Sequence, residues 1–259
     1  DTTAPLAPDI TTISVDDGSS NTDGITSDNT LLISGTSEAN STIEVFLDGV
    51  SIGTTSTNAT GDWIFDYTGT VLADGDYILT AQATDLAGNT SLESSDYPIK
   101  IDTTLPVPSL TIDDITVDNI VNAIEASGTI AITGTVGGDF TTGDTVSLVI
   151  NGVISTGTID ASGGFSIDVS GNDLALDADT TVAGSVSTTD LAGNIGTATH
   201  DKVYTIDTTL PVPTLTIDDI TTDNIVNAIE ASGTITITGT VGGDFTSGDT
   251  VSLVINGVT

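Results

Sequence analysis

Acidic turns hold most of the groups in this sequence that could do chemistry. The loop at 85–89 reads DLAGN and returns unchanged at 190–194, and the segment 16–28 reads DDGSSNTDGITSD. These turns offer carboxylate, amide and backbone oxygens, the donors that Ca²⁺ takes in sets of about 6–8 at roughly 2.3–2.6 Å. The segment 16–28 lacks the closing Glu and the spacing of an EF-hand loop. Asp and Asn also stabilise turns by bonding their own backbone, so the DLAGN loop can be a turn alone or a turn that also binds metal.

Other kinds of site have less support in the sequence. There is no Cys and only one His, His200, so thiolate and zinc chemistry are poorly supplied. Magnesium dehydrates reluctantly and seldom fills a cage of protein oxygens alone. His200 has no counterpart in the other repeats, and Asp16 and Asp17 are adjacent in a loop without the aromatic cleft of a glycosidase. We therefore expect calcium as the ligand and no enzyme activity.

The acidic turns belong to a polypeptide that repeats itself. Residues 101–153 return as 206–258 at an offset of 105 residues. The four substitutions are Ser109/Thr214, Val117/Thr222, Ala131/Thr236 and Thr142/Ser247. A weaker copy comes first, because DTTAP at 1–5 matches DTTLP at 102–106 and 207–211. The period suits a small domain better than a solenoid unit. The units predicted are 1–101, 102–206 and 207–259, the last being the N-terminal part of a truncated repeat.

Short strands must position these turns. Apolar residues alternate in short runs rich in Val, Ile and Thr, separated by Asp, Asn and Gly. Each full unit reads as about seven strands, and the last strand of the first unit is expected at Ser91–Ile101. Seven short strands at this spacing predict an all-β protein of tandem immunoglobulin-like β-sandwiches stacked end to end. The third unit has the equivalent of only the first three strands, so it cannot close a two-sheet core. The sequence begins without Met and stops within that repeat, so we expect a piece of a longer protein.

The strand order assigns each loop to one end of its sandwich. Stacking then brings together the lower loops of one unit, the Asp-Thr-Thr linker stiffened by Pro106 or Pro211, and the DLAGN loop of the next unit. Carboxylates gathered in this way repel one another unless a cation neutralises them. The predicted calcium ligands are Asp16, Asp17, Asp23, Asp28, Asp74, Asp76, Asp102, Asp190 and Asn194 at the first joint, Asp113, Asp114, Asp118, Asn119, Glu125, Asp177, Asp179 and Asp207 at the second, and Asp85 and Asn89 in the first DLAGN loop.

The overall charge narrows the range of partners. Thirty-seven acids face only Lys100 and Lys202, giving a net charge of −35. Nucleic acid and anionic membrane surfaces are excluded as partners, because binding phosphate requires basic groups. No apolar run is long enough to cross a membrane, so no direct membrane insertion is expected. The acids could instead only solvate the surface or keep neighbouring units from associating.

Three motifs carry a resemblance to a known family. They are DTT(A/L)P, DLAGN, and VGGDFxxGDTV at 136–146 and 241–251, and the resemblance they carry extends over the whole sequence. They resemble the bacterial Ig-like extender repeats of giant RTX-type biofilm and ice-binding adhesins. The resemblance implies type I secretion, retention at the outer membrane, calcium at the joints and a rod that projects a ligand-binding tip. The nonapeptide repeats, the retention module and the tip are not in this sequence, so the tip ligand is not expected here.

The function expected is that of a calcium-rigidified spacer, or extender, in a secreted cell-surface adhesin that serves cell adhesion and biofilm formation. Its partners would be the neighbouring Ig-like repeats of the same polypeptide, outside the cell at the bacterial surface. Two alternatives stay open: a binding module for sugar, ice or protein, and an accessory domain of a secreted hydrolase. Near-identity of the last two repeats favours the spacer, because a recognition site is seldom needed in every unit.

Overall fold

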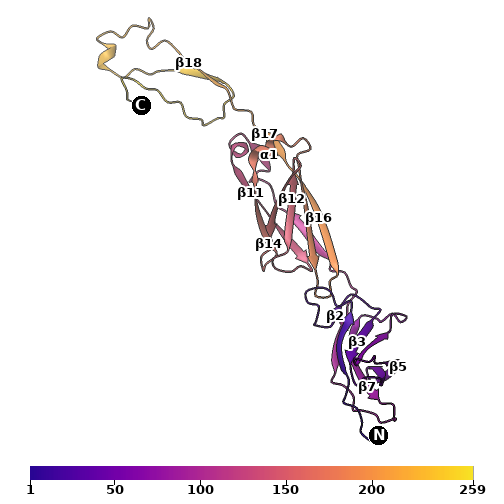
Figure 1. Cartoon of the computed structure of the whole chain (residues 1–259). Coiled ribbons are helices and arrows are strands. Elements are labelled where there is room, and N and C mark those ends of the chain that lie inside the picture. The colour runs from indigo at the N-terminus through magenta and orange to yellow at the C-terminus, as the bar shows by residue number, and fades with distance from the viewer. Residues whose placement is uncertain (259) are drawn as a thin grey trace.

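The computed structural model describes residues 1–258, and its regular secondary structure is almost all β-strand, which confirms the predicted fold class. Its parts lie end to end in an elongated molecule with the N-terminus at one end and the last repeat at the other (Figure 1). Two hydrophobic cores, one within residues 10–101 and the other within residues 110–206, fill the first two parts. Among residues 1–258, no helix has the length and apolar character needed to span a membrane.

The first part packs a three-stranded sheet, in the order β1-β3-β6, against a five-stranded sheet, in the order β2-β8-β7-β4-β5. Trp63 and Phe65 point inward from one sheet and Leu79 and Ala81 from the other, as strand alternation requires. The strands are β1 Asp9–Ser14, β2 Ile25–Thr26, β3 Leu32–Thr36, β4 Thr42–Leu47, β5 Val50–Ser56, β6 Asp62–Asp66, β7 Gly75–Thr84 and β8 Tyr97–Ile101.

The second part repeats this plan with the sheets β14-β11-β9 and β13-β12-β15-β16 and a short pair, β10-β17. In β11 every second residue from Ile130 to Val136, except Gly134, brings an apolar side chain into the core, where Leu148 and Val186 face them. The strands are β9 Pro108–Ile112, β10 Ile120–Asn122, β11 Thr129–Gly138, β12 Thr145–Ile150, β13 Val153–Thr158, β14 Gly164–Ser170, β15 Thr181–Thr189, β16 Ile195–Val203 and β17 Thr205–Asp207.

Within residues 208–258, the third part forms one antiparallel pair of strands, β18 (Pro213–Ile217) with β19 (Gly239–Gly243), and a short helical turn, η2 (Glu230–Ser232). Leu215 is 49% exposed and Ile217 52%, whereas their counterparts Leu110 and Ile112 in the second part are 6% and 2% exposed. The same side chains therefore lie in a core in one repeat and face solvent in the other. The predicted third unit extends to Thr259, which lies outside the described residues.

The last strand of the first part differs from the sequence expectation. The pattern predicted a strand from Ser91 to Ile101, but β8 begins at Tyr97. The Ser91 hydroxyl accepts the Ala83 N–H at 2.9 Å, and the Ser94 hydroxyl accepts the Ala81 N–H at 3.0 Å. Serine side chains thus accept the N–H groups that a neighbouring strand would bond, and residues 91–96 leave the ladder.

Two helical turns in the second part were also not expected. They are η1 (Glu125–Ser127) and α1 (Gly171–Leu176). The Ser170 hydroxyl accepts the Asp173 N–H at the start of α1, and Leu174 is fully buried beneath it. A six-residue helix is too short to show a 3.6-residue period, so the alternation of the flanking strands concealed it.

Candidate functional site

The first joint lies where the loop 16–29 and the linker 102–106 of the first part meet the DLAGN loop of the second (Figure 1). The loop 16–29 is anchored to its own sandwich by β2, which runs parallel to β8. Lys100 N donates to Gly24 O at 2.8 Å, and Asp102 N donates to Thr26 O at 3.0 Å. These bonds place the loop beside the point where the backbone leaves the sandwich.

The DLAGN loop has a rigid internal geometry. Asp190 Oδ1 accepts the backbone N–H groups of Ala192 and Asn194, each at 2.9 Å, and Asp190 Oδ2 accepts Asn194 Nδ2 at 2.9 Å. Asp85 and Asn89 make the same side-chain bond at 2.8 Å in the first part, and hydrogen bonds from Asn89 lower the pKa of Asp85. Both loops are therefore structural turns, whether or not they also bind metal.

Direct hydrogen bonds join the two sandwiches. Ser27 N donates to Ala192 O at 3.0 Å, and Ser19 N donates to Leu191 O at 3.4 Å. Asn194, which is 7% exposed, donates from Nδ2 to the Asp102 carbonyl at 2.7 Å. The loop that closes on itself through Asn194 thus also holds the linker.

Two glycines allow this close approach. A Cβ on Gly18, whose φ is +101°, would lie 2.3 Å from Leu191 O and 2.8 Å from Gly193 N. A Cβ on Gly193, whose φ is +90°, would lie 3.1 Å from Gly18 N. The joint is therefore a backbone-to-backbone contact that leaves no space for a side chain at Gly18 and little space for one at Gly193.

Asp16 is the electrostatically unusual member of the joint. Its Oδ2 accepts the Gly24 N–H at 3.3 Å, but its Oδ1 is buried without a hydrogen-bond partner among residues 1–258. Burial raises the pKa of Asp16, and the charges of Asp23 and Asp17 raise it further. An ionised carboxylate with an unpaired buried oxygen beside two like charges is unfavourable, and a cation would relieve it.

The other predicted ligands of the first joint have different surroundings. Asp74 accepts bonds from Thr103 and Thr104, which lower its pKa and attach the linker to the first sandwich. Asp28 accepts from Val15 N at 2.8 Å, and Asp23 accepts from Ile25 N at 3.0 Å. Oδ1 of Asp17 lies 3.5 Å from the hydroxyls of Thr26 and Ser27. Asp76 is opposite Lys100 in the β7–β8 pair. Asp102 forms a salt bridge with Lys100 at 3.2 Å.

The predicted ligands near the second joint bond mainly to groups within the second part. Asp177, 7% exposed, accepts from the buried Tyr204 hydroxyl at 3.1 Å, and together with burial it raises the pKa of Tyr204. Asp114 pairs with Lys202 at 2.5 Å. The others accept from near neighbours: Asp113 from Thr133, Asp118 from Thr116 and Ile120, Asn119 from Ile115, Glu125 from Asn122, Asp179 from Thr181, and Asp207 from Thr209. Among residues 1–258, none of them makes a hydrogen bond with residues 210–258.

The donor set of the first joint suits a hard divalent cation better than any other group, because it consists of carboxylate, hydroxyl and carbonyl oxygens. The unpaired Asp16 oxygen beside Asp17 and Asp23 is the observation that fits a cation. Within residues 1–258, however, no three acidic side chains converge closely enough to hold a metal ion. Binding would therefore require the side chains of loop 16–29 to turn toward a common centre.

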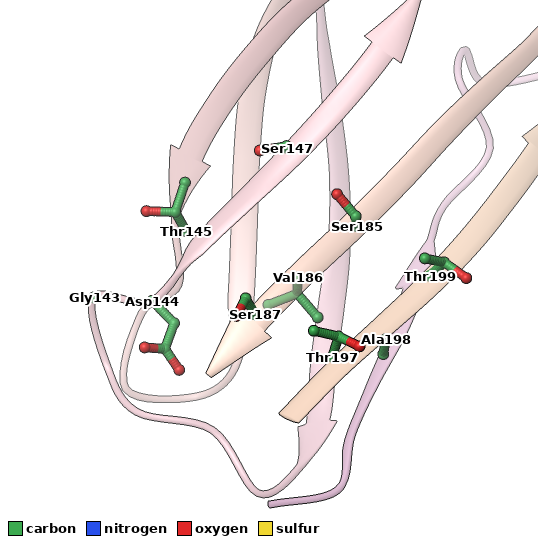
Figure 2. Close-up of a pocket in the computed structure, with 10 residues that line it drawn as sticks. All are labelled: Gly143, Asp144, Thr145, Ser147, Ser185, Val186, Ser187, Thr197, Ala198 and Thr199. Atoms are coloured by element: carbon green, nitrogen blue, oxygen red, sulfur yellow. The ribbon is translucent and has the colours of Figure 1, made fainter. Parts of the chain in front are cut away.

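A recess on the second sandwich bears on the alternative of a binding module. It has a volume of about 510 Å³ and lies on the outer face of β12, β15 and β16 (Figure 2). Six of its ten lining residues carry a hydroxyl group, namely Thr145, Ser147, Ser185, Ser187, Thr197 and Thr199. No aromatic side chain lines it, so it lacks the stacking surface on which sugars commonly bind.

Sequence reasoning did not identify every residue of the joint. It named Asp102 and Asn194, but it missed Gly18, Ser19 and Ser27. These three act through their backbone, and small residues in a polar loop carry no pattern that would single them out. The positive φ of Gly18 could have been suspected only from its place between acidic turn residues.

The fold and the joint define a protein built of bacterial Ig-like domains. The family profile described as bacterial Ig-like domain matches residues 3–103. One similar structure is a Ca²⁺-stabilised adhesin that helps an Antarctic bacterium reach out and bind ice; it is 36% identical over 98% of this chain, with a TM-score of 0.67, and 62% of its length is covered. Another, from a 1.5-MDa bacterial ice-binding adhesin, is 32% identical over 98% of this chain and 82% of its own, with a TM-score of 0.64.

This chain belongs to the family of bacterial Ig-like adhesin domains, which confirms the resemblance seen in its motifs. It spans less than two thirds of the first of those two structures. No protein with a curated description matches it.

Proposed function

We propose that the protein is a calcium-rigidified spacer in a secreted cell-surface adhesin, composed of the units 1–101, 102–206 and 207–259. The observation that carries the proposal is the first joint, where backbone bonds from Ser19 and Ser27 and a side-chain bond from Asn194 link one sandwich directly to the next. A joint of this kind fixes direction along an elongated molecule (Figure 1). Catalysis is not part of the proposal.

Calcium has a defined task in this proposal. Hydrogen bonds already align the first two units, while Asp16 carries an unpaired buried oxygen beside Asp17 and Asp23. Bound calcium would neutralise these carboxylates and remove the repulsion that opposes the aligned state. Affinities of about 10⁻⁴–10⁻³ M would suit an extracellular module. An ion that binds only the aligned, folded state stabilises it by mass action.

The similar adhesins suggest where this protein acts. Proteins of this family include an adhesin described as Ca²⁺-stabilised and one described for retention at the host cell surface. We propose that this protein likewise acts outside the cell at the bacterial surface, with the neighbouring repeats of its own polypeptide as partners. A role in biofilm formation is the finer part of the proposal and rests on the motif resemblance.

Small-angle scattering on residues 1–259 tests the proposal. The profile would be recorded in millimolar calcium, in millimolar magnesium and in excess chelator, with thermal melts in the same buffers. The expected result is a stiffer particle and a higher Tm in calcium than in chelator, with magnesium closer to chelator. An identical profile and Tm in calcium and chelator would overturn calcium rigidification. A molecule that is flexible at the first joint in all three buffers would overturn the spacer itself.

A further inference from the structure

The turn between β12 and β13 is an Asn-Gly pair in a tight hairpin. Ile150 faces Val153 across the ladder, and Asn151 and Gly152 connect them with φ values of +49° and +76°. Positive φ at both positions is the mark of a two-residue hairpin turn, which Asn-Gly favours. Both residues are exposed, and space around Gly152 is open, because a Cβ built there meets nothing within 4 Å.

No hydrogen bond restrains the reactive groups of this turn. Among residues 1–258, neither the Asn151 amide group nor the Gly152 N–H has a hydrogen-bond partner. The corresponding turn of the first sandwich is different, because Asp48 Oδ1 accepts the Ile78 N–H at 2.8 Å. Asn194 differs too, since its amide is buried and bonded to Asp102 and Asp190. Asn151 is thus an exposed, unrestrained amide next to an unhindered backbone nitrogen.

We propose that Asn151 is a site of spontaneous deamidation. The Gly152 backbone nitrogen loses its proton to solvent and forms a bond to Cγ of Asn151. The bond between Cγ and Nδ2 of Asn151 then breaks, and Nδ2 leaves as ammonia after taking a proton from solvent. Water opens the resulting succinimide at one of its two carbonyls and gives aspartate or isoaspartate. No oxidant or reductant is involved, and water is the only co-reactant.

The β12–β13 hairpin accommodates aspartate at position 151 but not isoaspartate. Aspartate is compatible with the turn, because Asp48-Gly49 adopts φ values of +50° and +75° in the equivalent hairpin. Isoaspartate adds a methylene to the backbone, which lengthens a two-residue loop and disturbs the Ile150–Val153 pairing. The aspartate form therefore keeps the hairpin and adds one negative charge. Asn256-Gly257 repeats the turn with φ values of +50° and +77°, and it is the second site of the same kind.

The test is a time course of residues 1–259 in mildly alkaline buffer, followed by proteolysis and peptide mass spectrometry. The mass gained when an amide becomes a carboxyl should accumulate at Asn151 and Asn256 before any other Asn. We expect conversion of Asn151 at least about tenfold faster than that of Asn194, a barrier difference of about 1.36 kcal/mol. Asn194 is the internal control, because both amides age in the same sample.

Two variants sharpen the result. Gly152→Ala places a methyl group beside the attacking nitrogen and should slow conversion at residue 151 while leaving Asn256 unchanged. Asn151→Asp should melt at the Tm of the parent protein if the aspartate product fits the hairpin. Equal conversion of Asn151 and Asn194, or conversion of Asn151 only after addition of denaturant, would overturn the proposal. A much lower Tm for Asn151→Asp would overturn the claim that the turn accepts the product.

Discussion

Asp16 is the residue through which the first joint would respond to calcium in the proposed function. Its buried Oδ1 is unpaired and its pKa is raised, so the ionised carboxylate opposes folding in the absence of a cation. Asp16→Asn should therefore leave the Tm of the first sandwich unchanged or raise it in chelator. The same variant should reduce the increase in Tm that calcium produces. Thermal melts with and without calcium measure both effects.

The matched control for this variant is Asp96→Asn. Asp96 is exposed and makes no side-chain hydrogen bond among residues 1–258. Asp96→Asn therefore removes the same charge as Asp16→Asn, but from a solvated site instead of a partly buried one. Its calcium response should equal that of the parent protein. If both variants lose the response equally, calcium screens the general negative charge and does not bind at Asp16.

Asn194 should contribute more to the stability of its sandwich than its counterpart Asn89 contributes to the first. Both close a DLAGN loop on the preceding Asp, but only Asn194 is buried and bonded at 2.7 Å to a linker carbonyl, while Asn89 lies 3.5 Å from the Asp1 carbonyl. Asn194→Ala should destabilise the second sandwich by about 1–3 kcal/mol more than Asn89→Ala destabilises the first. Chemical denaturation gives the free energies of unfolding. Scattering should show a looser first joint only for Asn194→Ala, and equal effects would contradict the role of this bond.

At the scale of elements, the same strand exists in two states of burial. Ile112 of β9 is 2% exposed, and its counterpart Ile217 of β18 is 52% exposed. Ile112→Ala should lower the free energy of unfolding of the second sandwich by about 2–5 kcal/mol, because it leaves a cavity in a closed core. Ile217→Ala should change the free energy of unfolding little, since the Ile217 side chain already faces solvent. Urea denaturation of both variants checks this, and a similar large loss for Ile217→Ala would mean that the third part buries this residue.

The sequence predicted those elements whose physics is local. Alternation along the strand predicts Trp63 and Phe65 in the core, and the Asp48-Gly49 pair predicts a tight hairpin turn; both are found in the structure. The sequence pattern did not reveal that residues 91–96 lie outside the strand β8. Their serine hydroxyls accept N–H groups of the neighbouring strand β7, and such contacts between strands cannot be read from a local pattern. The short helix α1 was missed because six residues show no period.

The joint could be predicted only in outline. Counting strands gave each loop its end of the sandwich, and loop 16–29, the linker and the DLAGN loop do meet. The contacts that hold them are made by peptide groups at Gly18, Ser19 and Ser27, and backbone bonds leave no trace in residue types. Which carboxylates share an ion also depends on side-chain directions, so the predicted ligand set stays a prediction.

At the scale of the whole molecule, a change of pH should affect the stability of the folded state in two opposite ways. Hydrogen bonds lower the pKa of Asp74, Asp85 and Asp160, so their contribution to stability is present above the usual Asp value of about 3.9 and is lost as pH falls through their folded values. Asp16 acts oppositely, because its raised pKa makes the folded state less stable as pH rises through that value. Partial protonation also reduces the repulsion from a net charge of −35.

The expected result in chelator is a maximum of Tm near pH of about 4–5, with lower values both at neutral pH and at pH of about 2. Circular dichroism melts across this range measure it. A Tm that rises steadily down to the lowest pH would show that charge repulsion outweighs the hydrogen-bonded aspartates. In saturating calcium the decline toward neutral pH should be smaller, because the cation keeps Asp16 ionised without cost to the fold.

The exit strands β8 and β17 have a mechanical consequence. Each runs parallel to a short strand of its own sandwich, β2 or β10, and Tyr204 N and Thr205 N donate to carbonyls of Thr180 and Asn119. In the proposed spacer, tension would enter each sandwich at its first residues and leave through its last strand. Pulling that strand along its own length loads these bonds together in shear, which resists force better than opening them one at a time. Each sandwich should therefore withstand tension best when it is pulled apart through its two ends.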